Sequence, residues 1–250
     1  MKIFYLSIRF PLVIIHIFFG LIILIFFPRR IDSLKNIHHK ISLYWMKVLI
    51  MLFGLKLILK GNVSERAKAF VSNHISFLDI IVLNSIIPSN FVAKSEIKNW
   101  PIIGYLASKT GTIFIRRGDK DDIDSVVGIM KNYVDKGKNI IFFPEGRIGN
   151  GATIKKFHSK LFNSISNSEI IVQPIFIRYP IDYPNNVLSD DSVCWADKSQ
   201  TLFKISLRCL GRASTPVMVN FEKPIKSIDS TAYELAKLTS TSVLESSKNI

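Results

Sequence analysis

The stretch AFVSNHISFLDIIVL, residues 69–83, joins a short apolar run to the start of a helix. Residues 69–73 have the composition of a buried strand. Residues 76–79, Ser-Phe-Leu-Asp, have the form of a capping box, so a helix is expected to begin at Ser76. This order places His74 in the loop after a strand, which is where α/β proteins bind ligands.

The sequence beyond this stretch continues to alternate short apolar strands with helices. A helix is expected at about 121–136, where apolar residues recur at i, i+3, i+4 and i+7. The stretch from Ser230 onward is expected to form one more surface helix. Further strands are expected at 91–93, 112–116, 139–143, 170–178 and 216–222. The predicted fold class is α/β, with a mixed, largely buried sheet flanked by helices.

The N-terminus is far more apolar than the rest of the chain. Residues 10–27 read FPLVIIHIFFGLIILIFF, close to the length that spans a hydrocarbon core of about 30 Å; the alternative is a buried core helix. A basic stretch, 29–40, follows and is expected to stay cytoplasmic. Residues 41–59 are expected to form a helix that lies in the membrane surface, or else a core helix. We therefore divide the chain into a membrane-associating region, 1–60, and a second domain, 61–250.

The charge balance indicates an anionic partner. Lys and Arg number 33 and Asp and Glu 19, which gives a net charge of +14. Such an excess suits nucleic acid, a membrane surface or a charged substrate. The basic residues are dispersed, without zinc-finger spacing, an RNP motif or a basic helix, so no nucleic-acid partner is predicted. The two cysteines exclude a disulfide framework, and the scattered histidines predict no metal site; no cofactor is expected.

Several polar residues follow predicted strands and could carry chemistry. A histidine near a carboxylate can act as a general base, so His74 and Asp79 form a candidate pair. On one continuous helix residues five apart would point about 140° away from each other, so the pair requires His74 in the loop and Asp79 in the first helical turn. The alternative is a simple helix cap. Arg117, at the end of a strand, suits phosphate or is a solvated basic turn. Glu145 and Gly146 indicate a tight turn that binds a substrate or merely ends a strand.

The order and spacing of NHISFLD, GTIFIRR, FPEG and VQPIFI resemble the glycerolipid acyltransferase family, most closely its 1-acyl-glycerol-3-phosphate (lysophosphatidate) acyltransferase branch. The resemblance covers about residues 70–179. It implies that His74 deprotonates the acceptor hydroxyl and that Asp79 orients His74. It also implies that five residues hold the phosphate and glycerol part of the acceptor: Lys94, Arg117, Glu145, Gly146 and Arg147.

One block departs from the family pattern. The family often reads Glu-Gly-Thr-Arg, whereas this chain reads Glu-Gly-Arg-Ile at 145–148. Either Arg147 supplies the arginine one place early or that arginine is missing. A related branch that acylates lyso-ornithine lipid also tends to lack it, so lyso-ornithine lipid is the alternative acceptor.

The expected function is transfer of an acyl chain from acyl-CoA or acyl carrier protein to 1-acyl-glycerol-3-phosphate, giving phosphatidate. The sequence holds no G-x-S-x-G nucleophile elbow, and a base that delivers an alcohol directly to a thioester needs no protein nucleophile. The expected location is the cytoplasmic face of the cell or inner membrane, on an anionic membrane surface. The alternative from another class is a non-catalytic basic protein that binds membranes or lipids.

Overall fold

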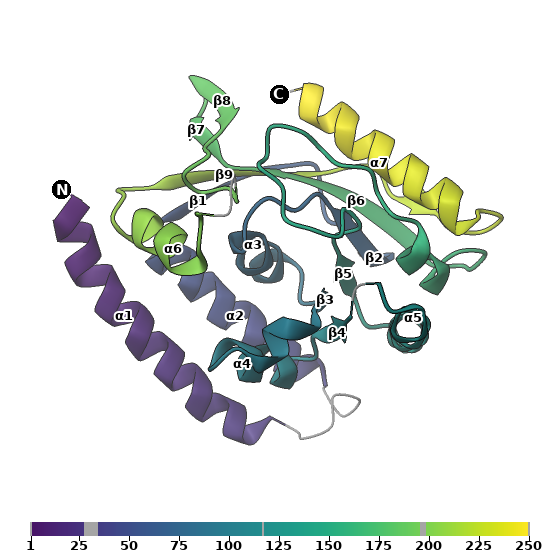
Figure 1. Ribbon diagram of the computed structural model, residues 1–250, viewed down its shortest axis with the longest axis horizontal. Coiled ribbons are helices and arrows are strands. Elements are labelled where there is room, and N and C mark those ends of the chain that lie inside the picture. Colours follow the sequence, from purple (N-terminus) through teal and green to yellow (C-terminus); the bar gives the residue numbers. More distant parts are fainter. Residues whose placement is uncertain (1, 28–34, 117, 196–198, 250) are drawn as a thin grey trace.

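The centre of the molecule is one twisted sheet (Figure 1). The computed structural model describes residues 2–27, 35–116, 118–195 and 199–249. Over these residues the sheet has eight strands in the order β1-β9-β6-β2-β5-β3-β4, with β10 also paired to β6. The strands are β1 (Leu55–Lys60), β2 (Ala67–Ser72), β3 (Asn90–Lys94), β4 (Ile113–Ile115), β5 (Ile140–Phe142), β6 (Ile171–Arg178), β9 (Thr215–Phe221) and β10 (Ile225–Lys226). The sheet is mixed, as predicted: β6, β2, β5, β3 and β4 run parallel, and β9 runs antiparallel to β6.

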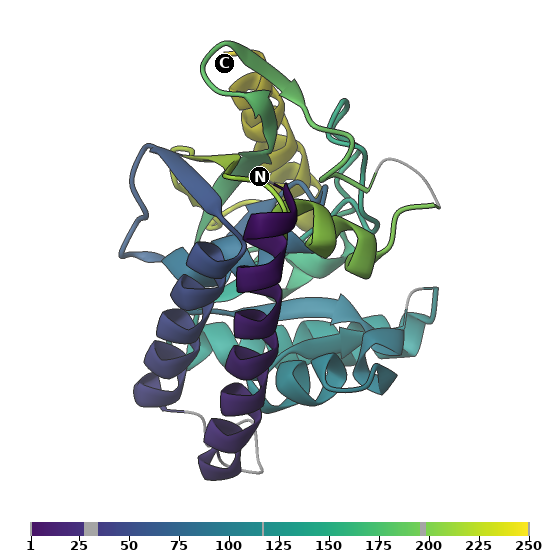
Figure 2. The ribbon, with the colours of Figure 1, turned by 90° about the vertical axis from the view of Figure 1, so that its left-hand side faces the viewer.

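Helices cover both faces of the sheet (Figures 1 and 2). One face packs on α5 and α7, and the other packs on α2, α3 and α6, with α1 outside them. The bounds are α1 (Lys2–Ile23), α2 (Asn36–Leu52), α3 (Leu78–Ile86), α4 (Ile103–Lys109), α5 (Lys120–Asp135), α6 (Leu202–Leu210) and α7 (Ala232–Lys248). Successive strand residues point to opposite faces, so Phe70 joins one core and Val71 the other. This double burial explains the continuous apolar runs of the strands.

The predicted strands are confirmed. The helices predicted from Ser76, at 121–136 and from Ser230 are also confirmed, as α3, α5 and α7, and the first of them begins two residues later than expected. The helix expected from Ser76 begins at Leu78, with Phe77 as its N-cap. One half of the predicted capping box forms, because the Asp79 carboxylate accepts from the Ser76 backbone N–H at 3.0 Å, whereas the Ser76 hydroxyl donates to the Val193 carbonyl. That carboxylate also binds the amide of Ile75, so the preceding residues are held as a loop rather than as a helical turn.

The prediction of one surface helix over 41–59 is wrong. α2 ends at Leu52, Gly54 adopts a positive φ of 66°, and the chain continues as β1, which pairs parallel with β9. The sheet therefore starts at Leu55, because β9 offers an open edge to which an apolar segment can add. Leu49 of α2 is buried in the core, which favours the core alternative for this helix. The division of the chain into 1–60 and 61–250 stays a prediction.

The N-terminal helix is long, apolar and largely uncovered. α1 continues without a break into a 3₁₀ turn at Leu24–Phe26, and the two form one helical stretch of 25 residues. With a mean hydropathy of 2.5, this stretch is the one helix within the described ranges that is long and apolar enough to cross a membrane. Most of its side chains face outward, with Phe18 60% exposed, and only a few such as Val13 and Leu24 are buried, which is unlike the buried core helix considered as the alternative. Residues 28–34, which include part of the predicted basic stretch, lie outside the described residues.

A two-stranded sheet completes the fold. It consists of β7 (Pro180–Asp182) and β8 (Asn186–Ser189), which follow β6 and were not predicted from the sequence. These strands are three and four residues long, too short for an apolar periodicity from which they could be recognised.

Candidate active site

The candidate site lies where the parallel strands β2 and β5 end side by side. Val71 of β2 pairs with Phe142 of β5, so the residues that follow each strand emerge at the same edge of the sheet. Asn73 extends the pairing beyond β2, because its side-chain amide donates to the Ile177 carbonyl and accepts from the Ile177 N–H, both at 2.9 Å. This amide bridge fixes the backbone just before His74.

His74 and Asp79 form a close pair, as predicted. His74 Nδ1 lies 2.7 Å from Asp79 Oδ2, with the histidine in the loop and Asp79 in the first turn of α3. Because a carboxylate accepts hydrogen bonds, Nδ1 carries the proton and Nε2 is left as the basic nitrogen. Both residues are buried, with His74 9% exposed and Asp79 fully covered. The arrangement suits a general base whose tautomer is fixed by a carboxylate.

Both carboxylate oxygens of Asp79 accept hydrogen bonds from the surrounding protein. Its Oδ2 accepts from the backbone N–H groups of Ile75 at 2.8 Å and Ser76 at 3.0 Å, besides the histidine. Its Oδ1 accepts from the Tyr179 hydroxyl at 2.8 Å. Burial, together with the negative charge of Asp79, raises the pKa of Tyr179 well above its usual value, so this hydroxyl stays protonated and remains a donor. The carboxylate is therefore fixed before any substrate binds.

Glu145 joins three loops rather than facing outward. Its Oε1 accepts from the His74 backbone N–H at 2.8 Å, and its Oε2 accepts from the Lys155 backbone N–H at 3.0 Å. Burial raises the pKa of Glu145, and the two amide hydrogen bonds oppose that shift. The next residue, Gly146, has a positive φ of 70°, as the predicted tight turn requires. Both oxygens of Glu145 are engaged by the backbone, so it positions the His74 loop.

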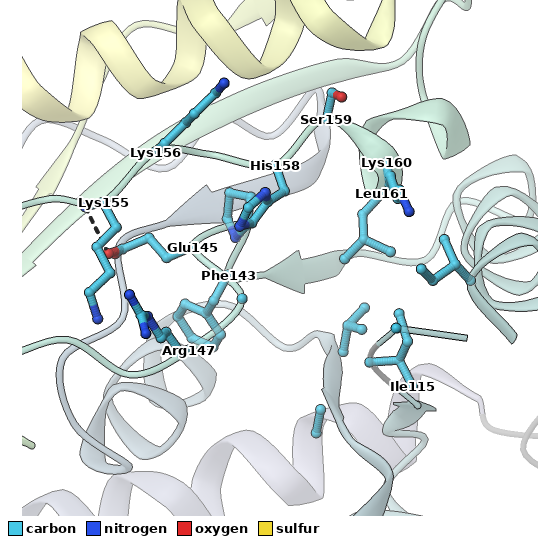
Figure 3. Close-up of a pocket in the computed structure, with 16 residues that line it drawn as sticks. Ile115, Phe143, Glu145, Arg147, Lys155, Lys156, His158, Ser159, Lys160 and Leu161 are labelled. Atoms are coloured by element: carbon cyan, nitrogen blue, oxygen red, sulfur yellow. Dashed lines mark hydrogen bonds between the residues drawn. The ribbon is translucent and has the colours of Figure 1, made fainter. Parts of the chain in front are cut away.

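A cavity of about 670 Å³ opens beside this pair (Figure 3). Phe143 connects the cavity to the His74–Asp79 pair: it lines the cavity, and its ring stacks on the His74 ring with centroids 4.0 Å apart. In Figure 3, Arg147 and Lys155 lie at the opposite end from the apolar Ile115 and Leu161. Five basic side chains line the cavity: Arg147, Lys155, Lys156, His158 and Lys160. Such a cavity can take an anionic group at one end and apolar atoms at the other.

Of the predicted binding residues, Lys94 does not line this cavity and Arg117 cannot be placed relative to it. Lys94 ends β3, and its Nζ lies 2.7 Å from Glu96 Oε1; it is not among the described residues that line the cavity. Arg117 lies outside the described residues, although the nearby Gly118 lines the cavity. Arg147 lines the cavity and has no hydrogen bond or ion pair with any described residue, while its predicted contact with a phosphate stays a prediction. No group of three or more His, Cys, Asp or Glu in the described parts of the chain could hold a metal ion.

Sequence reasoning missed three parts of the site. The run IKKFHSK, residues 154–160, contains four basic residues and could have been identified by its charge. Phe143 lies within a predicted strand and read as a core residue. Tyr179 lies 100 residues from Asp79, so only the fold brings its hydroxyl to the carboxylate.

The comparison with known families matches the part of the chain that carries this geometry. The sequence profile described as Acyltransferase matches residues 58–178. Residues 58–178 therefore resemble the acyltransferase family, and we call them the acyltransferase segment. The acyltransferase segment contains the His74–Asp79 pair, Glu145 and all of the described cavity lining. This confirms the predicted resemblance.

The curated relatives of this chain include lyso-ornithine lipid O-acyltransferases and 1-acyl-sn-glycerol-3-phosphate acyltransferases. The chain is 32% identical over 146 residues to the lyso-ornithine lipid O-acyltransferase of Pseudomonas aeruginosa, covering 58% of this chain and 56% of that protein. It is 36% identical over 108 residues to the 1-acyl-sn-glycerol-3-phosphate acyltransferase of Neisseria gonorrhoeae, covering 43% and 42%. The matches thus span about half the length of these relatives.

A solved structure shares the whole fold. The 1-acyl-sn-glycerophosphate acyltransferase PlsC of Thermotoga maritima superposes with a TM-score of 0.69 at 17% identity, over 100% of this chain and 97% of that one. The likeness confirms the predicted architecture, a mixed sheet flanked by helices and preceded by an apolar N-terminal helix.

Proposed function

We propose that this chain is a lyso-lipid acyltransferase that uses His74 as a general base oriented by Asp79. The observation that carries the proposal is the buried 2.7 Å contact between His74 Nδ1 and Asp79 Oδ2 beside a basic cavity. The names of the relatives, all O-acyltransferases or acylglycerol-phosphate acyltransferases, support the reaction class.

The reaction needs one proton to move twice. His74 Nε2 takes the proton of the acceptor hydroxyl as the oxygen attacks the carbonyl carbon of an acyl thioester. The carbon–sulfur bond breaks, and the departing sulfur takes the proton back from the imidazolium. Asp79 stabilises that imidazolium through Nδ1. The products are an ester and a free thiol of CoA or of acyl carrier protein.

The acceptor that fits best is 1-acyl-glycerol-3-phosphate. A phosphate suits Arg147 and its basic neighbours, because guanidinium groups bind phosphate oxygens in pairs of charge-assisted hydrogen bonds. Lyso-ornithine lipid is the second candidate, favoured by the relative from Pseudomonas and by the Glu-Gly-Arg-Ile block. Its headgroup carries a carboxylate, which the basic side chains could bind, and an ammonium, which would need an acidic partner. Glu145 is the one acid among the described lining residues, and backbone amides engage both of its oxygens.

The setting we propose is a membrane surface. The exposed helix Lys2–Phe26 would hold the chain in the bilayer, and the net charge of +14 would favour its anionic, cytoplasmic face. Both the acyl donor and lysophosphatidate are anionic, so the same charge would attract the substrates. A non-catalytic lipid-binding protein would need the charge but not the buried His74–Asp79 pair.

The test is thiol release from acyl-CoA or acyl carrier protein by the purified chain in detergent, with each lyso-lipid supplied in turn. We expect release that depends on lysophosphatidate and produces phosphatidate. Release that depends on lyso-ornithine lipid instead would select the second candidate. No acceptor-dependent release with any lyso-lipid, from a chain that binds them, would replace the enzyme with the binding protein.

A further inference from the structure

The segment between β3 and β4 presents a second group of apolar side chains to the outside of the molecule. It consists of a 3₁₀ helix, η3 (Ser95–Asn99), a short turn and α4. Four large apolar residues within six positions are 36–48% exposed: Trp100, Ile102, Ile103 and Tyr105. Single exposed apolar residues are ordinary on a protein surface, whereas a cluster of this kind marks an interaction site.

The backbone of this segment is strained at Ile102, within the exposed cluster. Ile102 has a φ of 63° and a ψ of −62°, and the Ile103 N–H donates to the Pro101 carbonyl at 2.6 Å. This is a γ-turn with positive φ, a conformation that a β-branched residue rarely adopts and that persists where the surroundings enforce it. Gly104 contributes to the enforcement, because a Cβ there would lie 2.2 Å from the Lys98 carbonyl oxygen of η3.

The cluster continues from the apolar N-terminal helix. Leu106 of α4 packs on Leu24 and Phe27, at the end of that helix, and Figures 1 and 2 both place α4 beside the C-terminal half of α1. Next to this contact, Ile25 is 72% exposed and Phe26 is 82% exposed. The two apolar surfaces therefore meet.

The charges around the cluster are those of a membrane interface. Residues 94–109 contain three lysines and one acid, Glu96, which is paired with Lys94. The Nζ of Lys109 lies 5.9 Å from the ring centre of Tyr105. Tryptophan and tyrosine beside lysine are typical of residues that lie at the headgroup level of a bilayer, and lysines attract anionic lipids.

We propose that residues 95–109 form a membrane-contact element that, together with the N-terminal helix, seats the molecule on a bilayer with anionic headgroups. The inference rests on the membrane setting proposed above for that helix. It also gives the cavity a route to its substrate: β3 leads directly into η3, and Val92 and Ala93 of β3 line the cavity. A lyso-lipid could then reach the cavity from the bilayer without crossing water.

The test is quenching of Trp100 fluorescence by brominated lipid. The full chain with Trp45→Phe and Trp195→Phe keeps Trp100 as its sole tryptophan. It is reconstituted in vesicles of phosphatidylethanolamine and phosphatidylglycerol, with or without dibrominated acyl chains. We expect the brominated chains to remove most of the emission. In the native chain, which keeps Trp45 stacked on His16, Trp100→Phe should correspondingly reduce the quenchable part of the emission.

Two reporters serve as controls in a background without the natural tryptophans. Phe18→Trp places a tryptophan on the anchoring helix α1. Leu188→Trp places one on the β7–β8 hairpin, remote from the proposed contact, where the native Leu188 side chain is 67% exposed. We expect quenching of the first and none of the second. Unquenched Trp100 beside a quenched α1 reporter would overturn the contact element while leaving the anchor. Unquenched emission from both would overturn the membrane setting, and thiol release would still test the enzyme separately.

Discussion

The His74–Asp79 pair and the basic wall of the cavity differ in how the protein holds them. His74 and Asp79 are buried, and the carboxylate accepts four hydrogen bonds from the protein, counting the histidine, two backbone amides and Tyr179. Arg147, Lys156 and Lys160 are exposed and make no hydrogen bond or ion pair with any described residue. The protein's own hydrogen bonds therefore orient His74 before any substrate binds, whereas the positive charges of Arg147, Lys156 and Lys160 remain available to an anionic ligand.

This contrast separates the expected effects of substitutions. Changing the buried pair should alter the rate of the chemical step, because interactions made in the transition state set kcat. Changing the basic wall should alter KM for the anionic substrate and leave kcat nearly unchanged.

The largest effect is expected from Asp79→Asn. An asparagine whose Oδ1 takes the place of the present Oδ2 can still accept from His74, Ile75 and Ser76, so the fold should be kept. The negative charge that stabilises the imidazolium is lost, so kcat for acyl transfer should fall by about 10²- to 10⁴-fold. The measurements are turnover and the unfolding midpoint in detergent. A folded variant that lost stability and kept its turnover would reduce Asp79 to a helix cap.

The next effect is expected from Arg147→Ala. If Arg147 binds the phosphate, Arg147→Ala removes its pair of charge-assisted hydrogen bonds; a loss on the order of 1.5–3 kcal/mol should raise KM for lysophosphatidate about 10- to 150-fold. KM for the acyl donor should not change. Lys131→Ala, at an exposed lysine on α5, is the matched control for loss of one positive charge. A rise in KM for the donor alone would assign Arg147 to the CoA or carrier-protein site.

A smaller effect on rate, with a clear effect on stability, is expected from Tyr179→Phe. The change removes one of the hydrogen bonds to the buried Asp79 carboxylate and leaves the other three. A hydrogen bond to a charged group contributes about 1.5–3 kcal/mol, so the free energy of unfolding should fall by that amount. Tyr233→Phe, at a tyrosine 65% exposed on α7, should leave it unchanged. Equal stability of both variants would mean that the Tyr179 contact does not hold the carboxylate.

The smallest effect is expected from Lys94→Ala. The family resemblance implies that Lys94 meets the phosphate, whereas the structure pairs it with Glu96 on the surface, away from the described cavity lining. Exposed ion pairs contribute little, so KM for lysophosphatidate should change by less than about twofold. An increase as large as that of Arg147→Ala would restore Lys94 to the acceptor site and show that its side chain turns toward the cavity when substrate binds.

The sequence was enough to predict the parts of the site that are local. The strand, loop and helix around His74 and Asp79 follow one another within a few residues, so their patterns predict the pair correctly. The sequence pattern predicts β1 as part of a helix, because its apolar residues follow those of α2 without a break. The helix and the strand are separated by the turn at Gly54, which adopts a positive φ. Tyr179 and the backbone partners of Glu145 could not be predicted, because those contacts depend on which strands become neighbours.

The central claim, that His74 is the base, is tested most directly by thiol release from the acyl donor by His74→Ala in the presence of lysophosphatidate. The variant should have the same fold by circular dichroism, bind vesicles as the native chain does, and release thiol about 10²- to 10⁴-fold more slowly. Near-native release by a folded His74→Ala chain would contradict the account, because no acyl transfer could then depend on the pair that His74 forms with Asp79.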